Sequence, residues 1–283
     1  MRSQSTTATT IPSCALWIVL VGLLALPARG HDMWITPIAD AAVDAPVRID
    51  VLVGHGGDSD PVRRSAERLV RFEAHGPSNA PPSTVAGIDG GLPMGVFRPD
   101  APGPWIVGYV STAVTHTMEP AKFDAYLVEE GLEAVRAQRR AQGTDDQPGT
   151  EWYSRSLKTL VSVGPDAAGA PADRAIGLPV ELLLEKVDGG AVVVRLLVDG
   201  APTADALVDL RRPASAEASA AGRTDAEGRL RLALGADAAD AAAGPWVAAT
   251  VHMVAEKTPE ADWRTTFATL SFVLPPPSAG GGG

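Results

Sequence analysis

Five histidines are the residues of this sequence whose chemistry stands out. None of them shows the helical H-x-x-x-H spacing or a zinc-finger spacing, so their pattern alone does not define a metal site. An imidazole, with an ordinary pKa of about 6.5, binds divalent metal ions and exchanges protons close to neutral pH. Metal binding is therefore the first chemistry to consider. The five are His31, His55, His75, His116 and His252.

The environment of His31 depends on the segment before it. Cys14 to Leu26 reads CALWIVLVGLLAL, a run much shorter than the roughly 20 apolar residues that a membrane-spanning helix needs. Ala28 and Gly30 then supply the small residues of a signal-peptide cleavage site. We expect residues 1–30 to be a signal peptide and the periplasmic or secreted protein to begin at His31. An uncleaved membrane anchor is the alternative.

An N-terminal histidine has a covalent advantage as a metal ligand. Its α-amine and its ring Nδ1 can bind the same ion and close a chelate ring, and a third nitrogen from elsewhere would complete the site. The amine, with an ordinary pKa of about 7.7 to 8.0, and the imidazole can both be unprotonated near neutral pH. Such nitrogen ligands suit Ni, Co, Zn and Cu, and Cu(II) has the highest inherent affinity. The alternative is that export leaves an arbitrary first residue.

His55 and His252 are the two further candidates for metal ligands. His55 lies among glycines, in Gly54-His55-Gly56-Gly57 after an alternating strand, and His252 lies near the end of the alternating segment VAATVHMV. A solvated loop histidine and a half-buried histidine bonded to a carbonyl are the respective alternatives. His75 and His116 read as loop or strand-end residues and are weaker candidates.

The N-terminal part of the chain predicts strands followed by a helix. Residues 45–54 alternate apolar and charged side chains, residues 67–77 read as another strand, and residues 94–112 read as a hairpin with a Pro/Gly turn. Residues 119–142 predict a helix, with Pro120 suited to the first turn and a break at Gly131.

The C-terminal part predicts a second set of strands. After a linker candidate at 165–175, six short strands follow, with turn signals between most of them, which is typical of an immunoglobulin-like sandwich. The segments GPWIVGYV (103–110) and GPWVAATV (244–251) echo each other and suggest a duplicated sandwich.

The fold expected from these segments is mainly β. It has two immunoglobulin-like β-sandwich domains, at 31–164 and 176–275, with a helical insertion between them and a disordered tail at 276–283.

Composition excludes several kinds of partner and site. The net charge is −10, and removal of residues 1–30 takes away Arg2 and Arg29 but no acidic residue, which changes it to −12. With no large cluster of basic residues, nucleic acid is not an expected partner. Cys14, the only cysteine, lies in the signal segment. The exported chain therefore has neither disulfides nor thiolate ligands, and a metal site must use nitrogen and oxygen. No serine, cysteine or carboxylate-pair arrangement indicates a hydrolase.

Eight segments, in this order, resemble the NikM-like family of exported bacterial proteins associated with nickel uptake, and together they cover nearly all of residues 31–274. The resemblance implies an exported β-rich protein tied to nickel or cobalt import. The family's histidine-bearing motifs match at His31, His55 and His252, whereas His116 lies outside them. Asp32 could orient an imidazole by accepting its N–H. The segments are HDMWITP, VLVGHGG, KFDAYLVEEGLEAVR, EWYSRSLKTLVSVG, GLPVELLL, TDAEGRLRLAL, GPWVAATVHM and ADWRTTFATLSF.

The function expected from the residues and the resemblance is that of a periplasmic binding protein and not an enzyme. It would capture a divalent transition-metal ion, nickel before cobalt or copper, and deliver it to a membrane metal importer. His31 would capture the ion, His55 and His252 would close the site, and a fall in pH or a partner would release it.

Two other classes of function stay open. A copper-dependent oxidative enzyme could use the same N-terminal histidine, but it would need an exposed aromatic platform or an axial tyrosine. The three tyrosines, Tyr109, Tyr126 and Tyr153, are interpreted as packing residues. The other alternative is a metal-free adhesion or scaffold module.

Overall fold

The structure is a computed structural model that describes residues 32–55, 58–78, 80–164, 172–188, 190–213, 215, 217–235 and 243–275, with the backbone alone at 32, 39 and 55. The expectation of a mainly β fold is confirmed: two helices accompany strands that form several sheets in the described part. Within these ranges no helix has the length and apolar character needed to cross a membrane. The predicted signal peptide, His31 and the predicted disordered tail lie outside the described residues.

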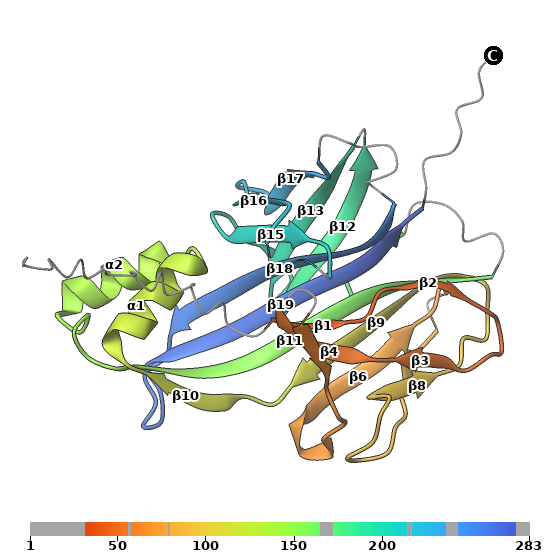
Figure 1. Cartoon of the computed structure of the whole chain (residues 1–283), viewed down its shortest axis with the longest axis horizontal. Helices are drawn as coiled ribbons and strands as arrows, with labels where there is room; N and C mark the ends of the chain where they lie inside the picture. The colour runs from red at the N-terminus through yellow and green to blue at the C-terminus, as the bar shows by residue number, and fades with distance from the viewer. Residues whose placement is uncertain are drawn as a thin grey trace, which may run out of the picture.

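A ten-stranded sheet runs through the whole molecule (Figure 1). Its central pair is β11 (Gly149–Val163) and β19 (Trp263–Leu274), which lie parallel to each other although they come from the two halves of the chain. Outward from β19, the sheet continues with β18 (Gly244–Ala255), β15 (Leu207–Arg211) and β16 (Ala220–Arg223). Outward from β11, it continues with β9 (Gly103–Ser111), β6 (Leu69–His75) and β7 (Ser83–Thr84). Two further strands also pair with β11, namely β2 (Ile38–Ala41) and β10 (Val114–Met118).

One face of this sheet is covered by the N-terminal strands. They form a three-stranded sheet and a two-stranded sheet, and their apolar side chains pack on β6, β9 and β11 in one core that contains Ile35, Val51, Phe72 and Trp105. The strands are β1 (Asp32–Ile35), β4 (Val51–His55), β5 (Asp58–Pro61), β3 (Val47–Ile49) and β8 (Gly95–Phe97).

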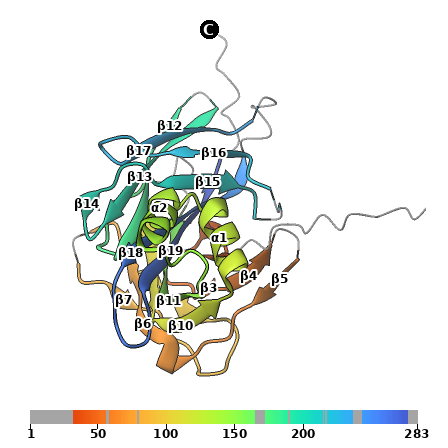
Figure 2. The ribbon, with the colours of Figure 1, turned by 90° about the vertical axis from the view of Figure 1, so that its left-hand side faces the viewer.

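The opposite face is covered by a C-terminal sheet. Its leucines and valines pack on β15, β18 and β19 around Trp246. The strands are β12 (Val180–Asp188), β13 (Ala191–Val198), β14 (Ala201–Pro202) and β17 (Arg229–Ala233). The molecule therefore has two sandwiches that share a continuous middle sheet (Figure 2).

The echo between the two GPW segments has a counterpart in this arrangement. Trp105 enters β9, which pairs antiparallel with β11, and Trp246 enters β18, which pairs antiparallel with β19. The indole of Trp105 lies in the N-terminal core and that of Trp246 in the C-terminal core. A pseudo-two-fold axis parallel to β11 and β19 would exchange β11 with β19, β9 with β18, and the N-terminal core with the C-terminal core. A duplicated sandwich predicts this relationship.

Two helices stand at one end of the sheet, on the N-terminal face (Figures 1 and 2). They are α1 (Pro120–Glu129) and α2 (Glu133–Gln142), separated at Gly131, whose φ of 66° stops the first helix. The predicted helix with a break at this glycine is thereby confirmed. Phe123 and Leu127 are fully buried against the end of the sheet.

Two local predictions were wrong. Residues 94–112 do not form a hairpin, because β8 pairs with β3 while both edges of β9 are occupied by β6 and β11. Residues 45–54 were predicted as one strand but contain two, β3 and β4, which are separated at Asp50 and belong to different sheets. In both cases alternation along one segment indicates strands without indicating their partners.

The linker candidate is firmly attached where it is described. The side chain of Asp173 is 0% exposed, and its carboxylate lies 2.7 Å from the Nζ of Lys158, whose side chain is 1% exposed. Lys158 Nζ also lies 2.8 Å from Glu181 Oε1, and Glu181 accepts the backbone N–H groups of Ile176, Gly177 and Leu178. Residues 172–178 connect the two halves of the chain. These contacts attach that connecting segment to β11 of the middle sheet.

Candidate functional site

The start of β1 is fixed against two neighbouring strands. Asp32 lies opposite Gly54 of β4, and the register continues without a shift through Met33 and Val53. From the middle sheet, Thr269 Oγ1 donates to the carbonyl of Met33 at 3.1 Å, and Ser271 Oγ donates to the carbonyl of Ile35 at 2.6 Å. Buried hydroxyls of β19 therefore position the first described strand.

Alternate side chains of β1 and β4 point toward the middle sheet. Ile35 and Val51 are 0% exposed in the N-terminal core. One step toward the start of β1, Met33 and Val53 lie opposite each other and line a cavity.

The cavity beside Met33 and Val53 has a volume of about 250 Å³. Its polar lining consists of three arginines, two tyrosines and two serines, and none of the lining residues is acidic. The lining residues are Met33, Val53, Val62, Arg63, Ser65, Arg68, Met94, Tyr109, Ser111, Tyr153 and Arg155.

The arginines reach the cavity from two elements. Arg63 and Arg68 belong to the segment around the short 3-10 helix Ala66–Arg68, and Arg63 donates to the carbonyl of Gly90 at 3.0 Å. Arg155 belongs to β11 and stacks on two rings, with its guanidinium carbon 4.7 Å from the centre of Phe267 and 5.8 Å from that of Tyr153. These stacking contacts hold Arg155 between the helices and the cavity.

Two tyrosines that were interpreted as packing residues also line this cavity. Tyr109 is buried and packs edge-to-face on Phe72, with 5.5 Å between ring centres. Burial raises the pKa of Tyr109, and the nearby Arg68 and Arg155 oppose that rise. Tyr153 packs edge-to-face on Phe267. Both rings thus pack and face the cavity.

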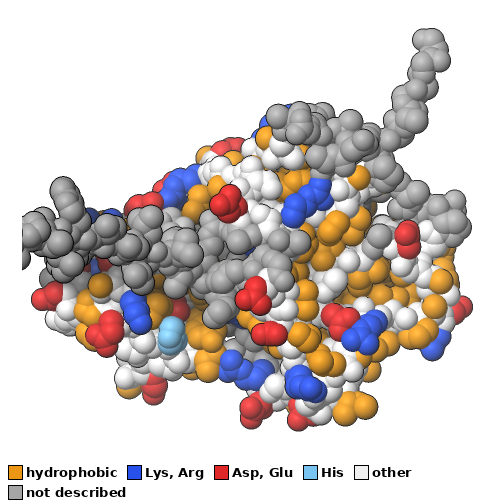
Figure 3. All heavy atoms as spheres, viewed as in Figure 1, with side chains coloured by type: hydrophobic (Ala, Val, Ile, Leu, Met, Phe, Trp, Pro, Cys, Tyr) orange, Lys and Arg blue, Asp and Glu red, His pale blue; other side chains and the backbone are white. Residues whose placement is uncertain are grey.

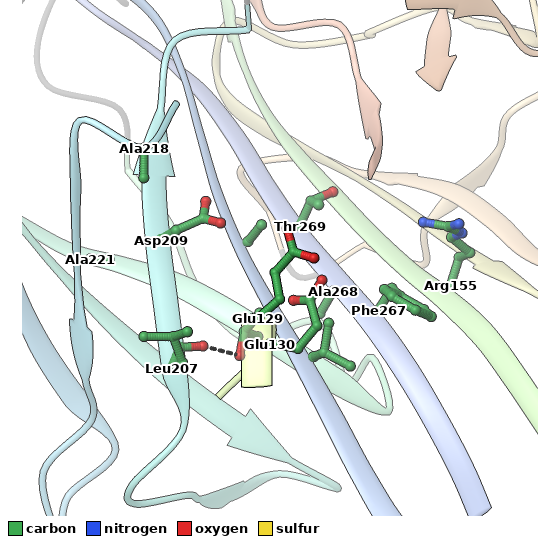
Figure 4. A pocket seen from close by; sticks show the side chains of 13 residues that line it. Glu129, Glu130, Arg155, Leu207, Asp209, Ala218, Ala221, Phe267, Ala268 and Thr269 are labelled. Carbon is green, nitrogen blue, oxygen red and sulfur yellow. Dashed lines mark hydrogen bonds between the residues drawn. The ribbon is translucent and has the colours of Figure 1, made fainter. Parts of the chain in front are cut away.

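A smaller pocket of about 80 Å³ lies on the other side of Arg155 and Phe267. Figure 4 shows Glu129 and Glu130, at the end of α1, and Asp209 of β15 around it. Thr269, which holds the carbonyl of Met33, lines this pocket as well. The start of β1 therefore lies between an acidic pocket and a basic cavity.

A buried carboxylate occupies the end of the sheet under the helices. Glu151 Oε2 accepts hydrogen bonds from Thr265 Oγ1 at 2.6 Å and from Tyr126 Oη at 3.3 Å. His116 Nδ1 lies 3.9 Å from Glu151 Oε1, and the His116 side chain is 55% exposed. Burial raises the pKa of Glu151. The sequence indicates no partner for His116, and the structure places Glu151 beside it.

His252 lies on the other face of the sheet. By the period-two alternation of β18, its side chain lies on the same face as Trp246 and Ala248, which belong to the C-terminal core. Val251 and Met253 point to the opposite face, which carries the helices. Burial lowers the pKa of His252, Arg264 lowers it further and Asp199, after β13, opposes the shift. The structure therefore does not bring His252 to the face of β1 and β4.

His75 is held in a structural network. Its Nε2 lies 2.7 Å from Glu73 Oε1, to which Arg71 also donates, and Arg71 donates to the carbonyls of Ile176 and Gly177 in the connecting segment. Burial lowers the pKa of His75, against the effect of Glu73. These contacts join β6 to the connecting segment.

No group of three or more His, Asp or Glu side chains suited to a metal ion occurs within the described ranges. His31 lies outside them, and His55 is described by its backbone only. A ligand set that includes either side chain is consequently left as a proposal.

Comparison with known families gives a match over residues 28–254 to the family described as "Domain of unknown function (DUF4198)". The chain belongs to this family. The DUF4198 match includes β1, β4, the cavity residues and both helices. No curated protein matches the chain. Among solved structures, the D0-D1 domain of intimin is similar over 86% of this chain and 97% of its own, with 11% identity and a TM-score of 0.19, which supports no conclusion.

The cavity residues of this DUF4198 chain were missed by sequence analysis. Arg63, Arg68, Tyr109 and Arg155 are spread over more than 90 positions, and no motif joins them. Period-two alternation places Tyr153 and Arg155 on one face of β11, but residues 149–163 were not predicted to form a strand. The sequence does place Arg63, Arg64 and Arg68 close together, but nothing in their spacing indicates a cavity.

Proposed function

We propose that the processed protein binds a divalent transition-metal ion, nickel or cobalt, and serves its uptake in the periplasm. The α-amine and ring Nδ1 of His31 and the imidazole of His55 supply three nitrogen ligands. This set needs two residues only, so His252 is not required. Nitrogen ligands of this kind suit both metals.

The register of β1 against β4 is the observation that carries this proposal. Asp32 lies opposite Gly54, so continuation of the pairing by one residue would set His31 opposite His55. Directly opposed residues of an antiparallel pair have Cβ atoms about 4.5 to 5.5 Å apart on one face. Two imidazoles at that separation can bind one ion. The resemblance to NikM-like proteins supports nickel as the cargo, with a membrane importer as the partner.

Native mass spectrometry of the processed protein with Ni(II), Co(II), Cu(II) and Zn(II) in turn tests the proposal. We expect one bound ion per chain, and a variant with one additional residue before His31 should bind at least tenfold more weakly, about 1.4 kcal/mol. The extension keeps both imidazoles and moves the amine, so it tests the chelate by itself. Equal affinity of the two proteins would contradict the proposal.

A copper-dependent oxidative enzyme is the second candidate, and the cavity favours it. Tyr109 and Tyr153 line the space beside β1, and so do the thioethers of Met33 and Met94, which are soft ligands that suit Cu(I). This function predicts a preference for copper over nickel. It also predicts that copper-loaded protein consumes O2 when ascorbate supplies electrons, while nickel-loaded protein does not.

A further inference from the structure

The cavity beside β1 concentrates positive charge in an acidic protein. The chain as a whole has a net charge of −10, yet Arg63, Arg68 and Arg155 line one space of about 250 Å³ without an acidic neighbour in the lining. Figure 3 shows basic and acidic side chains intermingled on the described part of the face in view. The three arginines therefore concentrate positive charge in one space of this acidic protein.

Several other arginines of the described residues are paired with carboxylates. Arg48 is paired with Asp50 and Arg229 with Glu185. By contrast, no ion pair joins Arg63 or Arg68 to an acidic group of the described residues, and Arg68 has no side-chain hydrogen bond within them. A guanidinium carries five donors in a fork that matches carboxylate oxygens. Arg63 donates from one Nη atom to the carbonyl of Gly90, and its remaining donors and those of Arg68 are available to a ligand.

The remaining lining complements a ligand that is both anionic and organic. Tyr109, Tyr153 and Ser65 add hydroxyl groups that can donate to an oxyanion, while Ser111 already donates to the carbonyl of Thr112. An apolar wall is formed by Met33, Met94, Val53 and Val62. One water needs only about 10–15 Å³ of such space. The cavity therefore holds a ligand of several atoms, and its apolar wall suits a carbon skeleton better than a compact inorganic anion.

We propose that this cavity binds a small organic anion with two or three carboxylate groups. Arg63 and Arg68 bind the carboxylates in bidentate fashion, Arg155 closes the inner end, and the tyrosine hydroxyls fix the orientation of the anion. The carbon skeleton lies along the methionines and valines. This recognition depends on described side chains alone, so it holds whether or not the protein binds a metal.

If the proposed function is correct, the anion has a second role that rests on it. The guanidiniums of the cavity would repel a metal cation bound beside them, because like charges at short range raise each other's free energy. A polycarboxylate between them would remove that repulsion and offer oxygen ligands to the ion. The metal would then be captured together with its anionic chelator.

Isothermal titration calorimetry with citrate on metal-free protein tests the anion site. Succinate and inorganic phosphate are the comparison ligands, and all titrations use the same ionic strength, because exposed charges are screened by salt. The variants are Arg68→Gln and Arg63→Gln, and the matched control is Arg231→Gln, an exposed arginine of β17 in the C-terminal sheet, remote from the cavity. Since Arg63 is exposed, its replacement should leave folding intact even if that of Arg68 does not.

We expect citrate to bind one site and to bind more tightly than phosphate. Arg68→Gln and Arg63→Gln should each weaken citrate binding at least tenfold, whereas Arg231→Gln should leave it unchanged. Absence of citrate binding, equal loss in all three variants, or tighter binding of phosphate than of citrate would overturn the proposal. The same titration on the variant with one additional residue before His31 should give an unchanged citrate affinity, so failure of the metal site and failure of the anion site are distinguishable.

Discussion

Asp32 lies directly opposite Gly54 in the antiparallel pair of β1 and β4. This pairing joins the predicted start of the exported chain to the end of β4, where His55 is the last residue. Gly54 has a φ of +151°, and a Cβ placed there would lie 2.7 Å from the Cα of Ser59. Only glycine fits where β4 approaches β5 this closely, so the end of β4 that carries His55 depends on this residue.

The first prediction concerns that glycine. Gly54→Ala should lower the free energy of unfolding by about 1–3 kcal/mol, because the added methyl group meets backbone atoms at a backbone conformation that L-residues rarely adopt. Gly143→Ala is the control, since Gly143 also has a positive φ but open space around it. Chemical denaturation measures both. Equal losses would show that backbone conformation, and not close approach, explains the glycine.

The second prediction separates the three candidate histidines. His55→Ala should abolish the proposed binding of one metal ion, whereas His252→Ala should leave metal affinity unchanged, because His252 lies on the opposite face of the middle sheet. Native mass spectrometry with Ni(II) compares the two variants. A loss of binding in His252→Ala, with the fold retained by circular dichroism, would contradict the assignment.

The third prediction concerns the buried ion pairs of the connecting segment. Lys158→Met should destabilise the protein by about 3–5 kcal/mol, because it leaves Asp173 and Glu181 buried without their cation. Lys186→Met removes an exposed partner of Asp188 and should change stability by about 0.5 kcal/mol or less. Urea denaturation of both variants checks the difference. A similar small effect in both would mean that the buried pairs do not hold the connecting segment.

The fourth prediction concerns pH and Glu151. Burial raises the pKa of this carboxyl, so the folded state binds its proton more tightly than the unfolded state does. Its contribution to stability therefore falls as pH rises from the ordinary pKa of a glutamate through the raised folded value. Glu151→Gln should flatten this decrease and raise the melting temperature relative to the natural protein at neutral pH, with the difference shrinking toward pH 4. An unchanged pH profile of melting temperature would show that Glu151 is not the titrating group.

The sequence by itself determined the local features of this protein. Period-two alternation predicted a mainly β fold, and Pro120 and Gly131 predicted where a helix begins and where it breaks. These predictions succeeded because they depend on neighbours within one strand or one helix turn. The proposed chelate of His31 is of the same kind, since it follows from the covalent position of the amine.

Tertiary structure decided which segments meet. The parallel pairing of β11 with β19 joins the two sandwiches through one sheet, and it fixes on which face each side chain lies. That pairing separates His252 from β1 and β4, and it brings Arg155 to the same cavity as Arg63 and Arg68. Alternation assigns a residue to one of two faces but does not say what covers either face. Only the packing of distant segments supplies that information, because burial depends on what the rest of the chain places there.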